Sequence, residues 1–247
     1  MHLSSNKSPR FAVVIPAYNH GASVKGVIES ALKLHLPVFV VDDGSTDTTA
    51  EAARSFPEAV VLRNQENMGK GAALLKGFAA ASQKADYAIT IDADGQHNPS
   101  DAVPMMASLK AGAPMLVIGR RENMLNDAMI AWTSRFGRKF SNFWVWAAGG
   151  PRLSDSQSGF RIYPIADVLR LKSRARRFQF EVEILVLAHW MGIPIIEVPV
   201  RVTYKPGGER VSHFRPFIDF WRNAFTFTRL ITIRLLLPMS LRKRILT

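Results

Sequence analysis

Two carboxylates one residue apart, Asp92 and Asp94, directly follow an apolar run at residues 87–91. The run has the composition of a strand that is buried on both faces, so we expect both carboxylates just beyond its end. An amide and an imidazole, Gln96 and His97, come next. Hard oxygen ligands of this kind suit Mg²⁺ or Mn²⁺ that also carries phosphate oxygens. Asp and Gly are also common in turns, which leaves a solvated turn as the alternative.

Polar clusters also follow two other apolar runs. The loop 16–19, Pro-Ala-Tyr-Asn, follows residues 11–15, and the pair Asp42 and Asp43 follows residues 38–41. Ligands of parallel α/β sheets bind beyond the carboxyl ends of the strands. Three polar clusters at three strand ends therefore predict a nucleotide site.

The segments between these runs have the spacing of helices, and the alternation predicts the fold. Strands alternating with helices across the first 119 residues indicate an α/β fold with a doubly wound, mostly parallel sheet. The remaining elements expected are strands at 60–62, 115–118 and 198–204, and helices at 22–35, 48–55, 69–84, 120–150, 178–188 and 217–237, with another after Pro99.

Composition and charge limit the class of protein. The 247 residues are 47% hydrophobic and include no cysteine, so disulfides are excluded, and the first ten residues predict no signal peptide. The net charge of +12 lies in the second half, because residues 1–119 carry 10 basic and 11 acidic side chains. A basic second half favours phosphates, anionic lipid or nucleic acid as a partner. No nucleic-acid module is visible, and the acidic strand ends would repel a nucleic-acid backbone, so we expect no nucleic-acid partner.

Five motifs give the chain a family resemblance: VVIPAYNH, VVDDGSTDTT, ENMGKGAAL, IDADGQHNPSD and SDSQSGFRIYP. Together they resemble the family-two glycosyltransferases with a GT-A, Rossmann-like fold, and most closely the dolichyl- or polyprenyl-phosphate sugar synthases. The resemblance implies that Asp42 and Asp43 contact the base and ribose of a nucleotide-sugar. It further implies that Asp92 and Asp94 hold the sugar and a divalent metal, with Gln96 as another ligand. We expect the donor site to include also Pro16, Ala17, Tyr18, Asn19 and Lys70. His20 departs from the pattern, since the family more often has Glu there.

Arginines after the fifth strand are candidates for acceptor binding. Arg120, Arg135 and Arg138 have guanidinium groups that suit phosphate oxygens, and the resemblance places arginines of this region on the acceptor phosphate. A merely solvated charge stays open for each of them. The resemblance also puts a polar segment beside the acceptor, with Ser158, Gly159 and Arg161 as its candidate residues.

Three residues are candidates for catalysis: Asp94, Glu183 and His213. Glu181 and Glu183 are two apart on the expected helix and so diverge, and either is alternatively a helix-surface charge. His213 belongs to a Ser-His pair after a glycine-rich loop, and an imidazole there could donate to a leaving phosphate oxygen. An acceptor phosphate is already ionised near neutral pH and needs no strong base.

The tail 217–247 is apolar but interrupted by charges. Arg222, Arg229 and Arg234 would each cost about 2.5–3.5 kcal/mol at a bilayer centre, so we expect no membrane span. The arginines at 215, 222 and 229 share one stripe opposite an apolar face, and 242–244 is Arg-Lys-Arg. This pattern predicts an amphipathic helix in the membrane interface, or alternatively a helix that packs on the core.

The sequence thus predicts a GT-A domain over residues 1–215 and amphipathic helices over 216–247. We expect a metal-dependent inverting glycosyltransferase of the cell envelope, attached peripherally or monotopically to the cytoplasmic face of a membrane. Its donor would be a nucleoside-diphosphate sugar, its cofactor Mg²⁺ or Mn²⁺, and its acceptor lipid-linked, most plausibly a polyprenyl phosphate. Transfer to a hydroxyl of another lipid or polymer, or non-catalytic binding of membrane or nucleic acid, are the alternatives.

Overall fold

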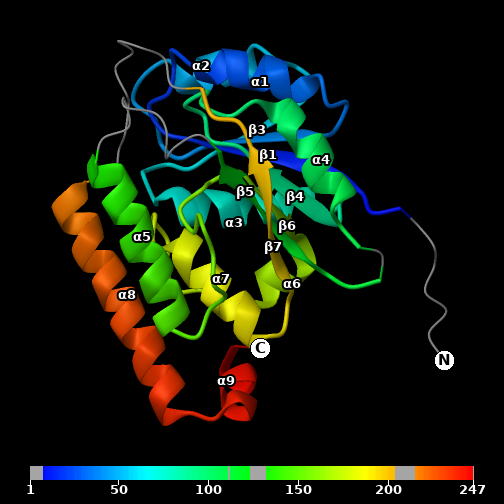
Figure 1. The fold of residues 1–247 in the computed structure, drawn as a ribbon. Helices are drawn as coiled ribbons and strands as arrows, with labels where there is room; N and C mark the ends of the chain where they lie inside the picture. The colour runs from blue at the N-terminus through cyan, green and yellow to red at the C-terminus, as the bar shows by residue number, and fades with distance from the viewer. Residues whose placement is uncertain (1–7, 111, 123–131, 204–214, 247) are drawn as a thin grey trace.

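The computed structural model describes residues 8–110, 112–122, 132–203 and 215–246. A seven-stranded sheet in the order β3-β2-β1-β4-β6-β5-β7 runs through it (Figure 1). The strands β1 to β4 are parallel to one another, β6 runs antiparallel to both of its neighbours, and β7 is parallel to β5. Their bounds are β1 Phe11–Ala17, β2 Val38–Asp42, β3 Ala59–Arg63, β4 Tyr87–Thr90, β5 Leu116–Arg121, β6 Arg161–Pro164 and β7 Ile195–Val200.

Helices cover both faces of the sheet (Figure 1). One core contains buried residues of α1, α2 and α4, and the other contains buried residues of α3, α5, α6, α7, α8 and α9. The bounds are α1 Val24–Leu32, α2 Thr49–Arg54, α3 Lys70–Ala81, η1 Pro99–Asp101, α4 Ala102–Ala107, α5 Trp132–Ala147, α6 Ile165–Arg170, α7 Phe180–Trp190, α8 Pro216–Leu236 and α9 Met239–Leu246. The predicted fold, a doubly wound and mostly parallel α/β sheet, is confirmed.

The central strands are apolar on both faces because both faces are covered. In β1, Ala12 and Val14 belong to one core, while Val13 and Ile15 belong to the other. Helix α3 lies very close to this strand: a Cβ added to Gly77 would come within 2.4 Å of the Val14 side chain. Close packing at this point fixes α3, and with it Lys70 at its start, relative to the ends of β1 and β4.

Strand β6 and the short helix α6 that follows it are elements that the sequence analysis did not predict. The four residues of β6 end the polar segment that was expected beside the acceptor, and the strand inserts between β4 and β5. The strand expected at 198–204 is confirmed as β7 at one edge of the sheet, although it begins at Ile195 and ends at Val200. Pro199 within it is compatible with an edge position, where one side of the strand needs no ladder hydrogen bonds.

The C-terminal helices pack against the rest of the domain. Phe227 and Leu230 of α8 and Leu246 of α9 are buried in the core that also contains α3 and α7. In Figure 1, α8 lies beside α5, and ring contacts between Phe140 and Phe220 (5.8 Å) and between Trp144 and Phe227 (6.4 Å) join the two helices. Within the described residues no helix combines the length and hydropathy that a membrane crossing requires.

Candidate active site

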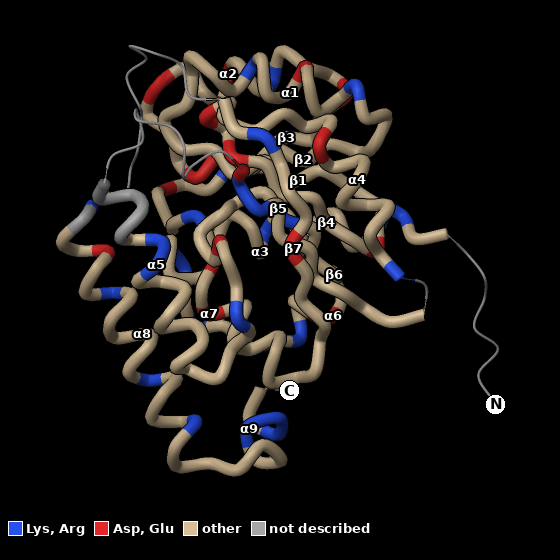
Figure 2. The backbone as a smooth tube through the Cα atoms, in the orientation of Figure 1, with Lys and Arg blue, Asp and Glu red and all other residues tan. Residues whose placement is uncertain are grey.

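The polar clusters predicted at three strand ends lie together. Because β2, β1 and β4 are parallel neighbours, their carboxyl ends meet at one edge of the sheet. Figure 2 shows acidic positions gathered toward this edge and basic positions along α8 and α9. The loop after β1 is joined to the loop after β2: Asn19 N donates to Ser45 Oγ (2.9 Å), and Asn19 Oδ1 accepts from Thr46 N (2.8 Å).

Lys70 links two carboxylates at this edge. Its Nζ lies 2.6 Å from Asp92 Oδ1 and 2.7 Å from Glu181 Oε1. Burial alone would lower the pKa of Lys70, but the two carboxylates outweigh it, so the pKa is raised and the ammonium stays charged. Burial disfavours the charged form of Asp92 as well, which for a carboxyl raises the pKa. The Lys70 ammonium outweighs this effect and holds the pKa of Asp92 below its usual range. The site therefore keeps Asp92 ionised at neutral pH.

Gly159 is the reason that this cluster can be so tight. A Cβ at this position would lie 2.3 Å from Asp92 Oδ2 and 2.7 Å from Lys70 Nζ, so no larger residue fits without moving them. The Gly159 carbonyl accepts a hydrogen bond from Thr90 Oγ1 (2.7 Å), which fixes its backbone against β4. The predicted residue Gly159 thus lies beside the predicted residue Asp92.

The predicted metal ligands follow one another around a turn. Asp94 Oδ1 accepts from the backbone N of Gln96 (3.0 Å), an Asx turn that orders the segment. In the part of the chain that is described, no three His, Cys, Asp or Glu side chains converge to hold a metal ion by themselves. Magnesium is commonly held by one or two carboxylates together with substrate phosphates and water. Asp92 and Asp94 fit a site of that kind, which a bound diphosphate would complete.

The two aspartates after β2 have different surroundings. Asp43 is buried, and its carboxylate accepts from Asn64 Nδ2 (2.7 Å), Met68 N (3.0 Å) and Gly69 N (2.7 Å), so it holds the loop that leads into α3. Asp42 Oδ1 accepts from Ser45 N (3.0 Å). Its Oδ2 lies 3.1 Å from Arg63 Nε without the alignment of a hydrogen bond, and no other described group donates to it.

Two further predicted donor residues, Pro16 and Ala17, are buried at the end of β1, while Tyr18 is half-buried. The backbone of Ala17 accepts a hydrogen bond from Asp43 N (2.8 Å). Tyr18 is therefore the member of this group whose side chain is most accessible to a ligand.

Arg161 is fully buried and contacts the protein backbone. Its Nε donates to Ser158 O (2.7 Å), Nη1 to Glu181 O (2.7 Å), and Nη2 to Ser156 O (2.8 Å). Arg161 thus joins the loop before β6 to the first turn of α7. Its guanidinium is occupied by the protein and has a positioning role, in place of the direct acceptor contact that we expected. Ser158 is also buried, and its Oγ has no hydrogen-bond partner in the described structure.

The arginines predicted to bind the acceptor are partly placed. Arg120 is partly exposed and lies 3.7 Å from Glu122, and Arg138 is buried on α5. The side chain of Arg135 and all of His213 lie outside the described residues. Next to Arg120, Arg121 forms a two-pronged ion pair with buried Asp155 (2.7 and 2.8 Å), which the sequence analysis did not predict.

Glu183 lies on the opposite side of α7 from Glu181. Its Oε2 accepts from Ser173 Oγ (2.5 Å) and Ala175 N (2.7 Å), and its Oε1 contacts Arg229 of α8. Both oxygens are thus engaged in holding elements together. The expected divergence of the two glutamates is confirmed, but Glu181, not Glu183, is the one that reaches the Lys70–Asp92 pair.

Comparisons with known proteins agree with this geometry. Residues 12–167 match the sequence profile described as Glycosyl transferase family 2. The chain is a family-two glycosyltransferase. It is 29% identical to the UDP-N-acetylglucosamine–dolichyl-phosphate N-acetylglucosaminyltransferase of Methanococcus voltae, over 78% of this chain and 85% of that one. It is 28% identical to the dolichyl-phosphate beta-glucosyltransferase of Drosophila melanogaster, over 90% and 76% of the two chains.

The fold of this glycosyltransferase is similar to that of glucosyl-3-phosphoglycerate synthase from Mycobacterium tuberculosis, solved with Mn²⁺, UDP and phosphoglyceric acid. The TM-score is 0.63 at 21% identity, over 93% of this chain and 80% of that one. The predicted GT-A fold is confirmed by this likeness.

His97, which belongs to the motif that contains Asp92 and Asp94, lies inside the protein. It is buried, packs on the Phe160 ring with centroids 5.2 Å apart, and forms a β-bridge with Val202. Burial is the main cause that lowers the pKa of His97 to about 4, so the imidazole is neutral at pH 7. Its position in the motif is visible in the sequence, but its contacts with Phe160, just before β6, and Val202, just after β7, are visible only in the structure.

Proposed function

We propose that this glycosyltransferase moves a sugar from a nucleoside-diphosphate sugar to the phosphate of a polyprenyl lipid, with inversion at the anomeric carbon. The names of the two dolichyl-phosphate relatives support the acceptor class. The observation that carries the proposal is the Lys70–Asp92–Glu181 cluster at the edge where three strands end. In α/β sheets this is where a nucleotide lies.

The residues have distinct roles in this proposal. Asp42, with one oxygen that lacks a donor, accepts a hydrogen bond from the base, while Asp43 shapes the loop that receives the ribose. Asp92, held by Lys70, orients the sugar through its hydroxyl groups. Asp94 is the residue that we assign to the divalent metal, and Mg²⁺ or Mn²⁺ held there would offset charge on the leaving diphosphate.

The reaction itself requires little from the protein beyond positioning. An oxygen of the acceptor phosphate attacks the anomeric carbon, while the bond from that carbon to the diphosphate oxygen breaks on the opposite face. The attacking oxygen is already ionised near neutral pH, so no proton has to be removed. Arg138 and Arg120 are the proposed contacts to the acceptor phosphate, because guanidinium groups suit phosphate oxygens.

A second candidate is transfer to a hydroxyl, which requires a base. Glu181 favours it, since its carboxylate lies in the cluster and could accept a proton. Its ion pair with Lys70 speaks against this role, because the ammonium 2.7 Å away already occupies a carboxylate oxygen. Glu181→Gln separates the two candidates: transfer to a phosphate should continue at a reduced rate, whereas transfer to a hydroxyl should stop.

Membrane attachment belongs to the proposal as well. The α8 helix packs on the domain by one side and still exposes large apolar residues by another, including Trp221, Leu235 and Leu236. Aromatic and aliphatic side chains of this kind enter the interface of a bilayer. We propose peripheral attachment at the cytoplasmic face, where the donor is available.

A donor screen tests the proposed function. The full chain is incubated with radiolabelled nucleotide-sugars and a synthetic polyprenyl phosphate, and label that partitions into solvent is measured with Mg²⁺, Mn²⁺ or a chelator. We expect one donor to label the lipid only when metal is present, and Asp94→Asn to abolish the signal without a change in the unfolding temperature. Full activity of that variant in chelator would remove the metal from the proposal.

A further inference from the structure

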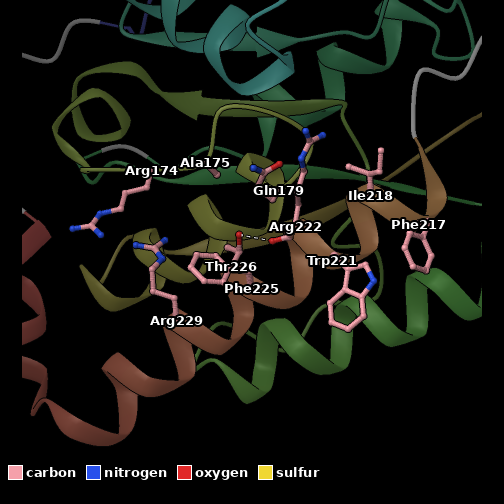
Figure 3. Close-up of a pocket in the computed structure, with 10 residues that line it drawn as sticks. All are labelled: Arg174, Ala175, Gln179, Phe217, Ile218, Trp221, Arg222, Phe225, Thr226 and Arg229. Carbon is pink, nitrogen blue, oxygen red and sulfur yellow. Dashed lines mark hydrogen bonds between the residues drawn. The ribbon is translucent and has the colours of Figure 1, made fainter.

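A groove of about 660 Å³ lies between residues 174–179 and the first half of α8 (Figure 3). Three aromatic side chains of α8 line it and are exposed: Phe217 by 76%, Trp221 by 60% and Phe225 by 74%. They are spaced four residues apart, so they form one stripe along the helix. Apolar side chains of this size are rarely left in water without a partner.

The other side of the groove is positively charged. Arg174, Arg222 and Arg229 line it, and among the described residues that line it none is acidic. Arg222 Nη1 lies 3.0 Å from Asp219 Oδ1, and Arg229 contacts Glu183. Each of these pairs uses only part of a guanidinium that has five N–H donors. Arg174 is exposed and makes no hydrogen bond or ion pair within the described part of the chain. The three cations therefore exceed the two carboxylates that face them.

Arg174 and Arg229 lie near each other at one end of the groove in Figure 3. Burial, and then the charge of Arg174, lower the pKa of Arg229. Two guanidinium groups that repel each other beside an apolar wall form a place where an anion relieves the repulsion. An anion joined to an apolar chain would satisfy both the arginines and the aromatic stripe.

The groove is separate from the donor site. Glu183, behind Arg229, and Glu181, beside Lys70, leave α7 on different sides of the helix. A phosphate held by Arg174 and Arg229 would thus have α7 between it and the Lys70–Asp92 pair. Such a phosphate cannot be the one that attacks the sugar.

We propose that this groove binds the head group of an anionic membrane phospholipid, with the phosphate on Arg174 and Arg229 and an acyl chain along Phe217, Trp221 and Phe225. The inference rests on the membrane attachment in the proposed function, and goes beyond it by naming a non-reacting lipid and its site. Binding of such a lipid would hold α8 in the interface.

Vesicle binding by the full chain tests the charged part of the site, without donor or acceptor. Phosphatidylcholine vesicles with and without phosphatidylglycerol are compared for wild type, Arg174→Ala and Arg170→Ala. The control, Arg170, is another exposed arginine at the end of α6, and it is not among the residues that line the groove. We expect Arg174→Ala to weaken binding to phosphatidylglycerol about fivefold, the effect of one charge near an anionic surface. Equal losses in both variants would show a diffuse surface charge and overturn the site.

Fluorescence quenching tests the apolar part and the identity of the occupant. Brominated phosphatidylglycerol should quench wild type more than Trp221→Phe, which keeps the apolar wall but lacks that fluorophore. Quenching should persist when glycerol phosphate or polyprenyl phosphate is added in equal amount. Loss of quenching with glycerol phosphate would make the groove a site for soluble anions, and loss with polyprenyl phosphate would assign it to the acceptor. Either loss overturns the proposal, while failure of the donor screen leaves this result unaffected.

Discussion

At the scale of single residues, the site depends on how closely the backbone at Gly159 approaches Asp92 and Lys70. We predict that Gly159→Ala lowers the rate of transfer roughly tenfold to a hundredfold, because displacing reacting groups by about an ångström has an effect of that size. Gly26→Ala is the matched control, since a Cβ at that position on α1 has no atom within 4 Å.

The control should keep full activity and gain about 0.5–1 kcal/mol of stability, because alanine favours a helix over glycine. Initial rates with the donor found in the screen, and chemical denaturation of both variants, check these expectations. A fully active Gly159→Ala would show that the contact is not needed for catalysis.

A second prediction at this scale concerns the buried pair of Asp155 and Arg121. Burial raises the pKa of Asp155, but the hydrogen bonds and charge of Arg121 lower it by more. The pKa of Asp155 in the folded protein therefore lies below the ordinary value of 3.8. A carboxyl whose pKa is lowered by folding stabilises the protein above its ordinary pKa, and this stabilisation is lost as pH falls through the folded value.

Asp155→Asn should therefore cost about 3–5 kcal/mol at pH 7, because it leaves the guanidinium of Arg121 without its counter-charge. The difference from wild type should stay constant down to about pH 4 and shrink only below it. Urea denaturation at several pH values measures this. A difference that already shrinks between pH 7 and pH 5 would contradict the lowered pKa.

The sequence predicted the residues of the candidate site better than it predicted the contacts among them. Asp92, Lys70 and Gly159 were all predicted, because strand ends and motifs mark positions in the chain. Their mutual contacts involve Glu181, which is 89 positions after Asp92, and no local pattern reports a distance of 2.7 Å across such a separation. Arg161 was misinterpreted for the same reason, since a fully buried arginine looks like any surface arginine until its carbonyl partners are known.

At the scale of elements, α7 connects the donor site to α8 through its two glutamates. We predict that Glu183→Gln destabilises the protein by about 2–4 kcal/mol, because Arg229 loses its charged partner and Ala175 N its ionised acceptor. The KM for the donor should change less than twofold, since Glu183 does not contact the Lys70–Asp92 pair.

Glu181→Gln on the same helix is the matched comparison, and should lower kcat with a smaller loss of stability. A double-mutant cycle of Glu183→Gln with Arg229→Gln should give a coupling above about 0.5 kcal/mol if the ion pair joins α7 and α8. Loss of kcat in Glu183→Gln at unchanged stability would instead restore the catalytic role expected from the sequence.

The elements were predictable where periodicity was strong. Parallel strands β1, β2 and β4 have uninterrupted apolar runs, and α3 begins at the glycine-rich motif, so both were found. Strand β6 has only four residues and follows a polar loop, and its place between β4 and β5 results from long-range antiparallel pairing. Pairing of this kind is not encoded in the local sequence.

At the scale of the whole molecule, the C-terminal tail combines the two alternatives that the sequence left open. It packs on the core, and it also exposes an apolar face that suits a membrane interface. Helix α8 buries Phe227 and Leu230 in the core, yet it exposes Phe225 by 74%. Its arginines are largely tied to the domain, because Arg229 contacts Glu183 and Arg234 donates to the Ala147 carbonyl (2.6 Å). Removal of the tail would therefore expose core residues, and surface substitutions are the cleaner experiment.

The last prediction uses such substitutions. Phe217→Ser with Phe225→Ser should keep the fold, since both side chains are exposed, but should weaken binding to vesicles of any charge. If each side chain contributes about 1 kcal/mol by partial burial in the interface, the pair accounts for roughly a thirtyfold change in partition. Val60→Ser with Val103→Ser, two exposed apolar positions on β3 and α4, is the control and should bind like wild type.

Salt separates this apolar part of the attachment from the electrostatic part. At about 1 M salt the Debye length is only about 3 Å, so attraction between the arginines and anionic lipid is screened while apolar burial persists. Wild type should thus stay partly bound to anionic vesicles in high salt, whereas the double serine variant should be released almost completely. Flotation at low and high salt measures both. Equal flotation of the variant and wild type under both conditions would show that the exposed face of α8 does not contact the membrane, and the attachment would then have to lie on another surface.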